Sequence, residues 1–229
     1  SASLYLSFKC SLLLMPCPLC FGEHIDSFFR DKKREYFRCV RCALVFVPAA
    51  FHLQSNDEKC EYDKHTNSPD NKDYIEFLGR LVYPLAKLLS EGAQGLDFGC
   101  GPGPAVATML AKFGVLVENY DQFYTDNKCF IGKHYDFVIA TEVVEHFREP
   151  QAEYARIWHC LKPGGTLGLM TKLVIDCDRF ARWHYKNDPT HISFHSMDTL
   201  NYLAALWGAE FTVLAADAFL FRKPLASLG

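Results

Sequence analysis

Four cysteines have the spacing of a metal site. Cys17 and Cys20 form one C-x-x-C pair and Cys39 and Cys42 another, with eighteen residues between the pairs. This spacing is typical of a tetrahedral zinc site with four thiolate ligands, although a redox pair or chance spacing would give the same pattern. Four protein ligands leave no open position for chemistry on the metal. We therefore predict a structural Zn²⁺ that stabilises a small zinc ribbon over residues 15–50.

A glycine-rich turn is the second candidate site. Residues 95–103 (GLDFGCGPG) lead from an apolar run into a turn, and a helix-like segment follows at once. Such a turn places backbone N–H groups and the positive end of a helix dipole around a ligand, and glycine lets the backbone approach that ligand closely. The dinucleotide motif G-x-G-x-x-G requires a third glycine where this chain has Pro104, which argues against NAD.

Acidic and histidine residues follow the glycine turn. Asp121 ends the next apolar run, where a carboxylate can accept both hydroxyls of a ribose; a turn-forming aspartate is the alternative. Glu142, Glu145 and His146 are spaced i, i+3 and i+4, which puts them on one face if a helix begins there. Such a group can act as a general base, hold a divalent cation or serve a purely structural role. Cys100 has no flanking base, so we do not expect a nucleophile there.

The elements that position these residues follow from the apolar periodicity. From Gly95 onward, strand and helix patterns alternate, which predicts an α/β fold with a doubly wound parallel sheet and ligands beyond the carboxyl ends of its strands. An amphipathic helix is expected over 74–90, with a candidate kink at Pro84. Ser196 and Gly208 are residue types that start and stop a helix. The predicted elements are strands 95–99, 115–120, 136–140, 166–171, 211–215 and 219–222 and helices 104–113, 150–160 and 197–207.

Three of these segments together resemble the class I S-adenosylmethionine-dependent methyltransferases. The glycine turn is similar to the first motif of that class, residues 135–147 (YDFVIATEVVEHF) to its fourth-strand motif, and residues 161–167 (LKPGGTL) to its turn into the fifth strand. The resemblance covers about residues 92–215. It implies a Rossmann-like sheet of seven strands, with S-adenosylmethionine as cofactor. The cofactor-binding residues that it implies are Asp97, Gly99, Cys100, Gly101, Gly103, Asp121, Thr141 and Glu142.

One segment departs from the family pattern. Only fourteen residues separate Asp121 from Asp136, where the family fits a helix, a third strand and another helix. A crossover to a neighbouring parallel strand alone takes about a dozen residues. We therefore predict a six-stranded sheet whose third strand is missing or vestigial. Phe123, Tyr124 and the backbone of Thr141 are the candidates for contacting the adenine.

The acidic and histidine residues carry a second resemblance. Glu-x-x-Glu-His at 142–146 is similar to the ubiquinone-pathway O-methyltransferases and to the terminal-nucleotide 2′-O-methyltransferases of small RNAs, in which a later histidine completes a metal site. Here that partner would be His191, which is also the best candidate for facing the substrate; a histidine satisfied inside a loop is the alternative. The predicted catalytic residues are Glu145, His146 and His191, with a divalent cation at these residues and Glu142 as one possibility.

A third resemblance joins the connecting region to the segment around His191. Tyr62-x-x-His65-x-Asn67 and residues 183–191 together are similar to a group of bacterial zinc-ribbon methyltransferases of unassigned substrate. Tyr62 and His65 are candidates for reaching the active site, with surface-loop residues as the default.

Charge and composition limit the partners. A net charge of −3 gives no global attraction to nucleic acid. The ribbon nevertheless carries basic residues that form either a solvated hairpin or a dock for RNA or an acidic partner. No apolar run approaches the length of a membrane span; we discount a signal peptide at Leu12–Leu14 and read Met15 as a start codon. The remaining cysteines are scattered singly, which favours the cytoplasm. The basic residues are Arg30, Lys32, Lys33, Arg34, Arg38 and Arg41.

The chain is expected to divide into three parts: the zinc ribbon over 15–50, a linker with an amphipathic helix over 51–91, and a cofactor-binding domain over 92–229. The leading hypothesis is methyl transfer to a small-molecule acceptor, with O-methylation expected. One alternative is an RNA methyltransferase that uses the basic ribbon. The other is a non-catalytic cofactor-binding protein with a zinc interaction module. Neither the acceptor nor the oligomeric state has a signal in the sequence.

Overall fold

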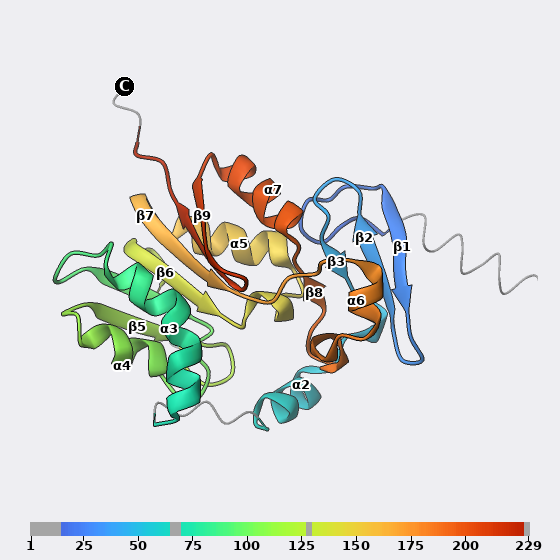
Figure 1. Ribbon diagram of the computed structural model, residues 1–229, viewed down its shortest axis with the longest axis horizontal. Helices are drawn as coiled ribbons and strands as arrows, with labels where there is room; N and C mark the ends of the chain where they lie inside the picture. The colour runs from blue at the N-terminus through green and yellow to red at the C-terminus, as the bar shows by residue number, and fades with distance from the viewer. Residues whose placement is uncertain (1–14, 65–69, 127–129, 227–229) are drawn as a thin grey trace, which may run out of the picture.

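The computed structural model describes residues 15–64, 70–126 and 130–226. A six-stranded sheet with helices on both faces forms most of the molecule, and a smaller four-stranded sheet lies at one end (Figure 1). The segment Leu12–Leu14 and the candidate residues His65 and Asn67 lie outside the described residues. No helix among the described residues is both long enough and apolar enough to cross a membrane.

The main sheet has the strand order β5-β4-β6-β7-β10-β9. Its first four strands are parallel, and β10 runs antiparallel to both β7 and β9. Within the described ranges no strand lies beyond β5, so the predicted six-stranded sheet without a third strand is confirmed. The strands are β4 (Gln94–Phe98), β5 (Leu116–Tyr120), β6 (Tyr135–Thr141), β7 (Leu161–Met170), β9 (Glu210–Ala215) and β10 (Ala218–Arg222).

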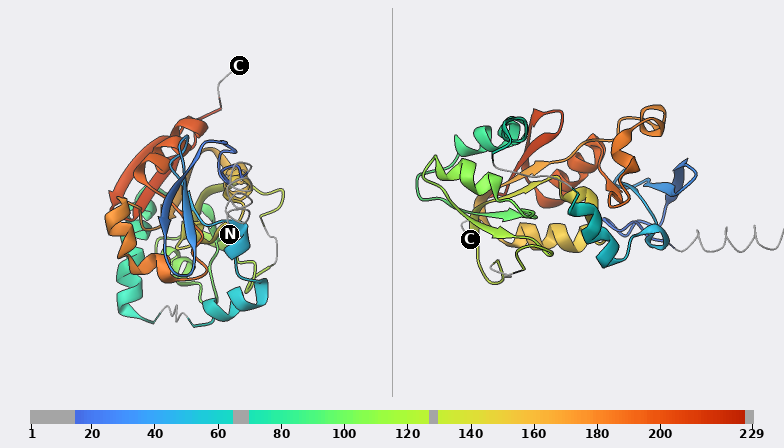
Figure 2. Two further views of the ribbon diagram at one scale, coloured as in Figure 1. Left: turned by 90° about the vertical axis from the view of Figure 1, so that its right-hand side faces the viewer. Right: turned by 90° about the horizontal axis from the view of Figure 1, so that it is seen from below.

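Helices cover both faces of this sheet because its central strands are apolar on both sides. On β6, Phe137 and Ile139 pack with α3 (Lys72–Ala86) and α4 (Ala105–Ala111), whereas the alternate residues Val138 and Ala140 face the other core. That second core contains α5 (Pro150–His159) and α7 (Met197–Trp207). Figure 2 shows α3 and α4 on one side of the strands and α5 on the opposite side. The doubly wound prediction is therefore confirmed.

Local signals placed most helix ends within a few residues. Ser196 caps α7 by accepting a hydrogen bond from the Thr199 N–H, and Gly208 ends it in the left-handed conformation, as predicted. The helix expected over 74–90 spans Lys72–Ala86, because Asn71 caps it earlier, and Pro84 lies in its last turn. Strand β7 begins at Leu161 rather than 166, but its register with β6 shifts between Leu161 and Thr166, so the predicted turn is an irregularity inside the strand.

The small sheet joins the two ends of the chain. Its strands are β1 (Ile25–Arg30), β2 (Glu35–Cys39), β3 (Val45–Phe46) and β8 (Ser193–Phe194), all antiparallel. We call residues 15–47 the N-terminal module. Strand β8 pairs with β3 and begins two residues after His191, so the module shares its sheet with the segment next to this histidine.

The connecting region is not wholly irregular. A helix, α2 (Ser55–Tyr62), and a short 3-10 turn, Ala49–Phe51, occupy part of the stretch that the polar composition predicts as a linker. Helix α2 has no apolar stripe, so its sequence lacks the usual helical signal. It is held instead by an ion pair between Glu58 and Arg148, with 2.6 Å between Oε2 and Nη2.

Candidate active site and cysteine cluster

A cavity of about 1170 Å³ opens at the carboxyl ends of β4, β5 and β6. This edge of a doubly wound sheet is where ligands bind, and the volume accommodates a cofactor together with an acceptor. Much of the lining comes from four segments: the glycine turn at 99–103, the loop at 120–124, residues 141–149 and residues 184–191. All the predicted cofactor-binding and catalytic residues lie in its wall.

The glycine turn has a backbone that only glycine fits well. Gly99 has φ of +83° and Gly101 +63°, both in the left-handed region. A Cβ on Gly99 would lie 2.4 Å from a methyl carbon of Val143. Gly99 therefore lets the turn pack closely against Val143, and the turn residues 99–103 line the cavity.

Asp97 supplies an unpaired carboxylate oxygen to the cavity. The residue is 2% exposed, and its Oδ1 has no hydrogen-bond partner among the described residues. Burial, followed by the charge of Asp121, raises the pKa of Asp97 to about 7. A buried acceptor in this position is complementary to a cationic group of a ligand, such as an α-ammonium.

Asp121 ties the loop after β5 to the glycine turn. Its Oδ2 accepts a hydrogen bond from the Gly101 N–H at 3.0 Å, and its Oδ1 accepts from Phe123 N–H at 2.8 Å and Tyr124 N–H at 3.2 Å. A carboxylate oxygen has two lone pairs, so Oδ2 retains acceptor capacity toward the cavity. A ribose contact of Asp121 stays a prediction.

The residues after β6 depart from the predicted helix. Glu142 has φ of +54°, and Val144–His146 form a 3-10 turn. Glu142 therefore does not share a face with the other two residues. The group of potential ligands that the structure brings together is Glu145, His146 and His191, whose donor atoms all lie within 4.8 Å of one another. We call these three residues the Glu–His–His cluster.

Glu142 lies in the cavity wall but outside this cluster. Its burial, followed by the charge of Glu145, raises the pKa of the Glu142 carboxyl to about 9.

Two hydroxyl groups that the sequence analysis missed hold Glu145. The carboxylate is completely buried; Oε1 accepts a hydrogen bond from the Tyr185 hydroxyl at 2.5 Å and Oε2 from the Thr171 hydroxyl at 3.1 Å. Both hydroxyls lie in segments that the sequence marked, Thr171 at the end of a predicted strand and Tyr185 in the aromatic segment before His191. Their partner was not visible, because 26 and 40 residues separate them from Glu145.

The two histidine rings have fixed orientations. Nδ1 of His146 lies 3.2 Å from the Thr190 carbonyl oxygen, and Nδ1 of His191 lies 2.7 Å from that of Tyr185. A carbonyl only accepts, so each Nδ1 carries the proton, and a neutral ring presents Nε2 as the acceptor. Burial lowers the pKa of His146, which keeps its ring neutral at pH 7. The ring centroids are 4.7 Å apart.

Helix α2 closes one side of the cavity. The Tyr62 ring packs edge-on against His146 with 5.0 Å between centroids, and the Tyr62 hydroxyl donates to Glu58 at 2.9 Å. Tyr62 therefore lies in a helix and lines the cavity, and the expectation that it is a surface-loop residue is wrong. The structure also places Phe123, an adenine candidate, 5.5 Å from the Tyr62 ring.

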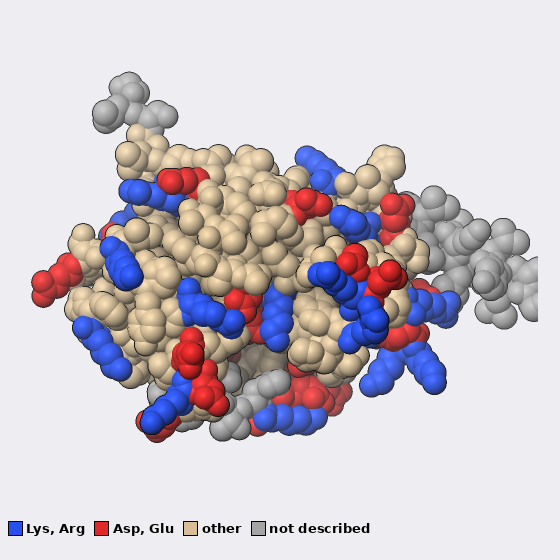
Figure 3. All heavy atoms as spheres, in the orientation of Figure 1, with Lys and Arg blue, Asp and Glu red and all other residues tan. Residues whose placement is uncertain are grey.

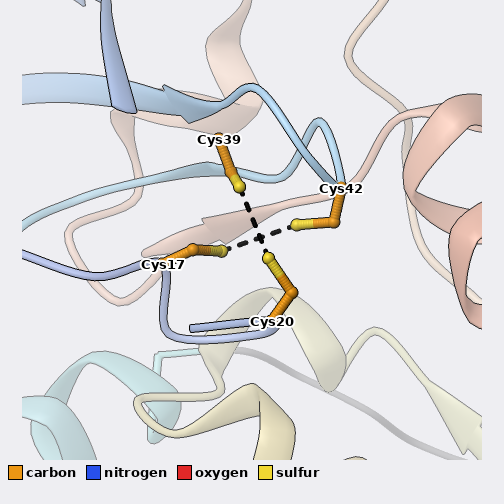
Figure 4. Close-up of side chains that lie close together, drawn as sticks. All are labelled: Cys17, Cys20, Cys39 and Cys42. Carbon is orange, nitrogen blue, oxygen red and sulfur yellow. Dashed lines mark hydrogen bonds between the residues drawn. The ribbon is translucent and has the colours of Figure 1, made fainter. Parts of the chain in front are cut away.

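Figure 4 shows the four cysteine side chains of the N-terminal module pointing at one another. The Sγ atoms of Cys17 and Cys42 are 3.5 Å apart, and those of Cys20 and Cys39 are 3.4 Å apart. A tetrahedral zinc with Zn–S bonds of about 2.3 Å separates its sulfurs by about 3.8 Å, so the cluster fits the ion with little movement.

Cys100 lies in the glycine turn, outside this cluster. Burial raises the pKa of its thiol to about 12, which agrees with the expectation that Cys100 is not a nucleophile.

The basic residues of the module do not form an uninterrupted cationic face. Arg30 pairs with Glu35 at 3.2 Å and Arg38 with Asp198 at 3.5 Å, while Arg34 is only 8% exposed. Figure 3 shows basic and acidic side chains beside one another over the end of the molecule where this module lies. Of the two interpretations of these residues, this pattern favours the solvated hairpin.

The family of the chain follows from comparison with known proteins. Residues 70–216, more than half of the chain, match the family described as methyltransferase domain. The chain belongs to the methyltransferase domain family. This family agrees with the three motifs, and the unpaired oxygen of Asp97 and the glycine turn fit the expected cofactor, S-adenosylmethionine.

A solved structure with a TM-score above 0.5 shows the same fold at low sequence identity. An O-methyltransferase family protein from Burkholderia thailandensis has a TM-score of 0.51 and 17% identity, covering 78% of this methyltransferase and 64% of that chain. An N-methyltransferase from Haemonchus contortus, solved with S-adenosylhomocysteine, has a TM-score of 0.45 and 16% identity, covering 69% and 43%. This methyltransferase thus spans less than two thirds of the length of either protein. No curated protein matches it.

Proposed function

We propose that this methyltransferase transfers the methyl group of S-adenosylmethionine to a hydroxyl oxygen of a small molecule. The proposal depends on one observation: the Glu–His–His cluster lies in the wall of the same cavity as the glycine turn. A hydroxyl loses its proton as it attacks a methyl group, whereas a neutral amine attacks without a base. A base beside the methyl donor is therefore the group that O-methylation requires.

The cavity wall offers a contact to each part of the cofactor. We assign the cationic amino group to Asp97, whose Oδ1 is unpaired, and the ribose to Asp121. The glycine turn would lie along the methionine part, and the loop after β5 would contact the adenine. The residues assigned to these contacts are Gly99, Cys100, Gly101 and Gly103 in the turn, and Phe123, Tyr124, Thr141 and Glu142 around the adenine and the reacting centre.

In this proposal His146 is the general base. When bound, S-adenosylmethionine supplies a methyl group that is already activated by its positive sulfur. Nε2 of His146 would take the proton that the acceptor hydroxyl loses when its oxygen accepts that methyl group. The Glu145 carboxylate, 4.0 Å from that nitrogen, stabilises the imidazolium that forms, and the proton then passes to solvent.

A divalent cation at the Glu–His–His cluster is a second candidate for the same residues. Their donor atoms lie within 4.8 Å of one another, and an Nδ1–H that donates to a carbonyl is the usual support of a ligating histidine. A cation would lower the pKa of a bound acceptor hydroxyl in place of the base. The two roles differ in one measurable respect: only the second makes activity depend on added Mg²⁺ or Mn²⁺ after chelation.

Zinc in the N-terminal module belongs to the same proposal. Four buried thiol groups at 3.4–3.5 Å across the cluster have the geometry of a closed structural site. We expect one Zn²⁺ per chain in elemental analysis of the purified protein.

The direct test is a search for the acceptor. The purified protein is incubated with methyl-labelled S-adenosylmethionine and size-fractionated cell extract, with and without nuclease treatment of the extract, and the labelled product is analysed by NMR. Label on an oxygen of a low-mass compound supports the proposal. Label on nitrogen or carbon, or label that disappears after nuclease treatment, refutes it.

A pair of matched variants tests the cluster. Glu145→Gln removes the charge beside His146 with almost no change in shape, and should lower the rate of transfer about 100-fold. Glu118→Gln is the control, because Glu118 lies outside the cavity and pairs with Lys133. Equal rates in the two variants would contradict the assigned role.

A further inference from the structure

The side chain of Arg34 reaches from the N-terminal module into the active-site wall. Arg34 lies in the turn between β1 and β2, and its backbone N–H donates to Asp31 at 2.9 Å. The guanidinium, however, contacts residues more than 150 positions later in the sequence. Figure 1 shows β8 beside β3, which pairs with β2 of the same module.

Each of the five N–H donors of this guanidinium has an oxygen partner. Nε donates to the Tyr36 hydroxyl at 3.2 Å. The other four bonds go to backbone carbonyls of one short segment, which we call the histidine loop (residues 185–191). Nη1 donates to the carbonyls of Pro189 at 3.2 Å and His191 at 3.0 Å, and Nη2 to those of Asp188 at 2.9 Å and Lys186. A planar fork with five fixed donors is unique to arginine.

Two of the three remaining carbonyls of the histidine loop hold the two catalytic rings. The Tyr185 carbonyl accepts from Nδ1 of His191, and the Thr190 carbonyl accepts from Nδ1 of His146. Arg34 therefore sets the path of a main chain whose intervening carbonyls orient both imidazoles. The Tyr185 side chain at the start of this loop also holds Glu145.

We infer that Arg34 is a positioning residue of the methyltransferase site, through which the N-terminal module sets the orientation of His146 and His191. The inference rests on the proposed function, in which these rings serve the acceptor. It gives the module a role in the reaction itself, rather than in substrate binding or stability alone. The backbone bond from Val47 N–H to the Ile192 carbonyl, at 2.9 Å, holds the other end of the loop to the same module.

Lysine cannot reproduce this arrangement. Arg34→Lys keeps the positive charge but offers three donors from a single nitrogen, so at least two of the five bonds are lost. We expect the histidine loop to lose its single path and both rings to lose their fixed Nδ1–H tautomers. Arg30→Lys is the matched control, because Arg30 lies in the same hairpin but is exposed and pairs with Glu35 at the surface.

The test uses the full protein and does not need the acceptor. Histidine-ring ¹⁵N–¹H NMR spectra report which nitrogen carries the proton. The wild type and Arg30→Lys should show the Nδ1–H form for both rings, whereas Arg34→Lys should show averaged tautomers. S-adenosylmethionine affinity from calorimetry should change less than twofold, and zinc content should stay the same. Unchanged tautomers in Arg34→Lys would overturn the inference.

Two further measurements cover a variant that folds poorly. In the wild type, the guanidinium N–H protons of Arg34 should give separate, slowly exchanging signals, and rapid averaging would contradict the inference. In Arg34→Ala, added guanidinium ion at low millimolar concentration should restore the ring tautomers, and no restoration counts against it.

Activity separates this inference from the proposed function. With an acceptor fraction in hand, Arg34→Lys should lower kcat by about 10- to 100-fold with an unchanged KM for S-adenosylmethionine, as expected for misplaced catalytic groups. If no O-methylation is found at all, the proposed function fails while the tautomer measurement still decides the structural role of Arg34.

Discussion

The unpaired carboxyl of Asp97 makes the stability of the cofactor-free protein depend on pH in a way that one substitution should remove. The folded-state pKa of Asp97 is raised to about 7 from 3.8, mainly by burial. Between these two values the folded chain binds a proton that the unfolded chain has lost. Stability therefore falls as pH rises through this window and levels off above about pH 7.

The magnitude follows from that pKa difference. Each pH unit inside the window changes the free energy of unfolding by about 1.36 kcal/mol, so the wild type should lose about 3 kcal/mol between pH 4.5 and 7 from this group. Asp97→Asn has no group to titrate there. The free energy of unfolding of the variant, relative to that of the wild type, should therefore rise by about 3 kcal/mol between pH 4.5 and 7. The new amide adds an offset that does not depend on pH.

Urea unfolding of the zinc-loaded, cofactor-free protein at pH 4.5, 5.5, 6.5 and 8 measures this difference. Proton competition at the cysteine cluster affects wild type and variant equally and cancels in the comparison. Asp136→Asn is an internal control of opposite sign: burial opposes ionisation of Asp136, but bonds from Gln94 N–H and Lys162 lower its pKa. The Asp136 carboxylate therefore stabilises the folded protein at pH values above its unfolded-state pKa. This stabilisation is lost as pH falls through the lowered folded-state pKa.

A difference between wild type and Asp97→Asn that stays constant from pH 4.5 to 8 would refute the reasoning. The same variant should bind S-adenosylmethionine about 10- to 100-fold more weakly, since a charge-assisted hydrogen bond contributes about 1.5–3 kcal/mol. Tighter folding with weaker cofactor binding is the signature of a group that is strained without its ligand.

Three other predictions concern single features of the fold. Cys39→Ser, or removal of zinc with a strong chelator, should lower Tm by more than 10 °C, because structural zinc contributes free energy comparable to the whole stability of a domain; an unchanged melting curve would show that the cluster holds no metal. Gly99→Ala places a Cβ 2.4 Å from Val143 at positive φ, so calorimetry should show S-adenosylmethionine binding weakened at least about tenfold, and wild-type affinity would contradict the tight turn. Ser196→Ala removes the cap of α7 and should lower the free energy of urea unfolding by about 0.5–2 kcal/mol; Asp73→Ala, at an exposed position of α3, should lower it by less.

Much of the fold could be predicted because its signals are local. The alternation of strand and helix periods specified the doubly wound sheet, and the short distance from Asp121 to Asp136 specified the missing strand. The glycine turn, the two C-x-x-C pairs and the helix cap at Ser196 are each contained in a few consecutive residues. Their geometry follows from backbone conformation and residue type, which the sequence states directly.

The site was predicted only in part, since its decisive contacts join distant segments. Sequence spacing placed Glu142 with Glu145 and His146, but the positive φ of Glu142 turns it away and leaves three residues together. Tyr62 on a polar helix, and the hydroxyls that hold Glu145, had no periodic pattern to mark them. When two residues lie far apart in the sequence and each also fits an ordinary loop or helix, no local sequence pattern shows that they contact one another.

By itself, the sequence determined the chemistry that this protein has available: a cofactor turn, a four-thiolate cluster, and acidic and histidine side chains after the third parallel strand, β6. Tertiary structure alone decided how these parts work together. It paired β8 with the N-terminal module and directed the Arg34 guanidinium to four carbonyls of the histidine loop. Backbone carbonyls are the same in every residue, so their recognition depends on how the chain folds in space and leaves no trace in residue type.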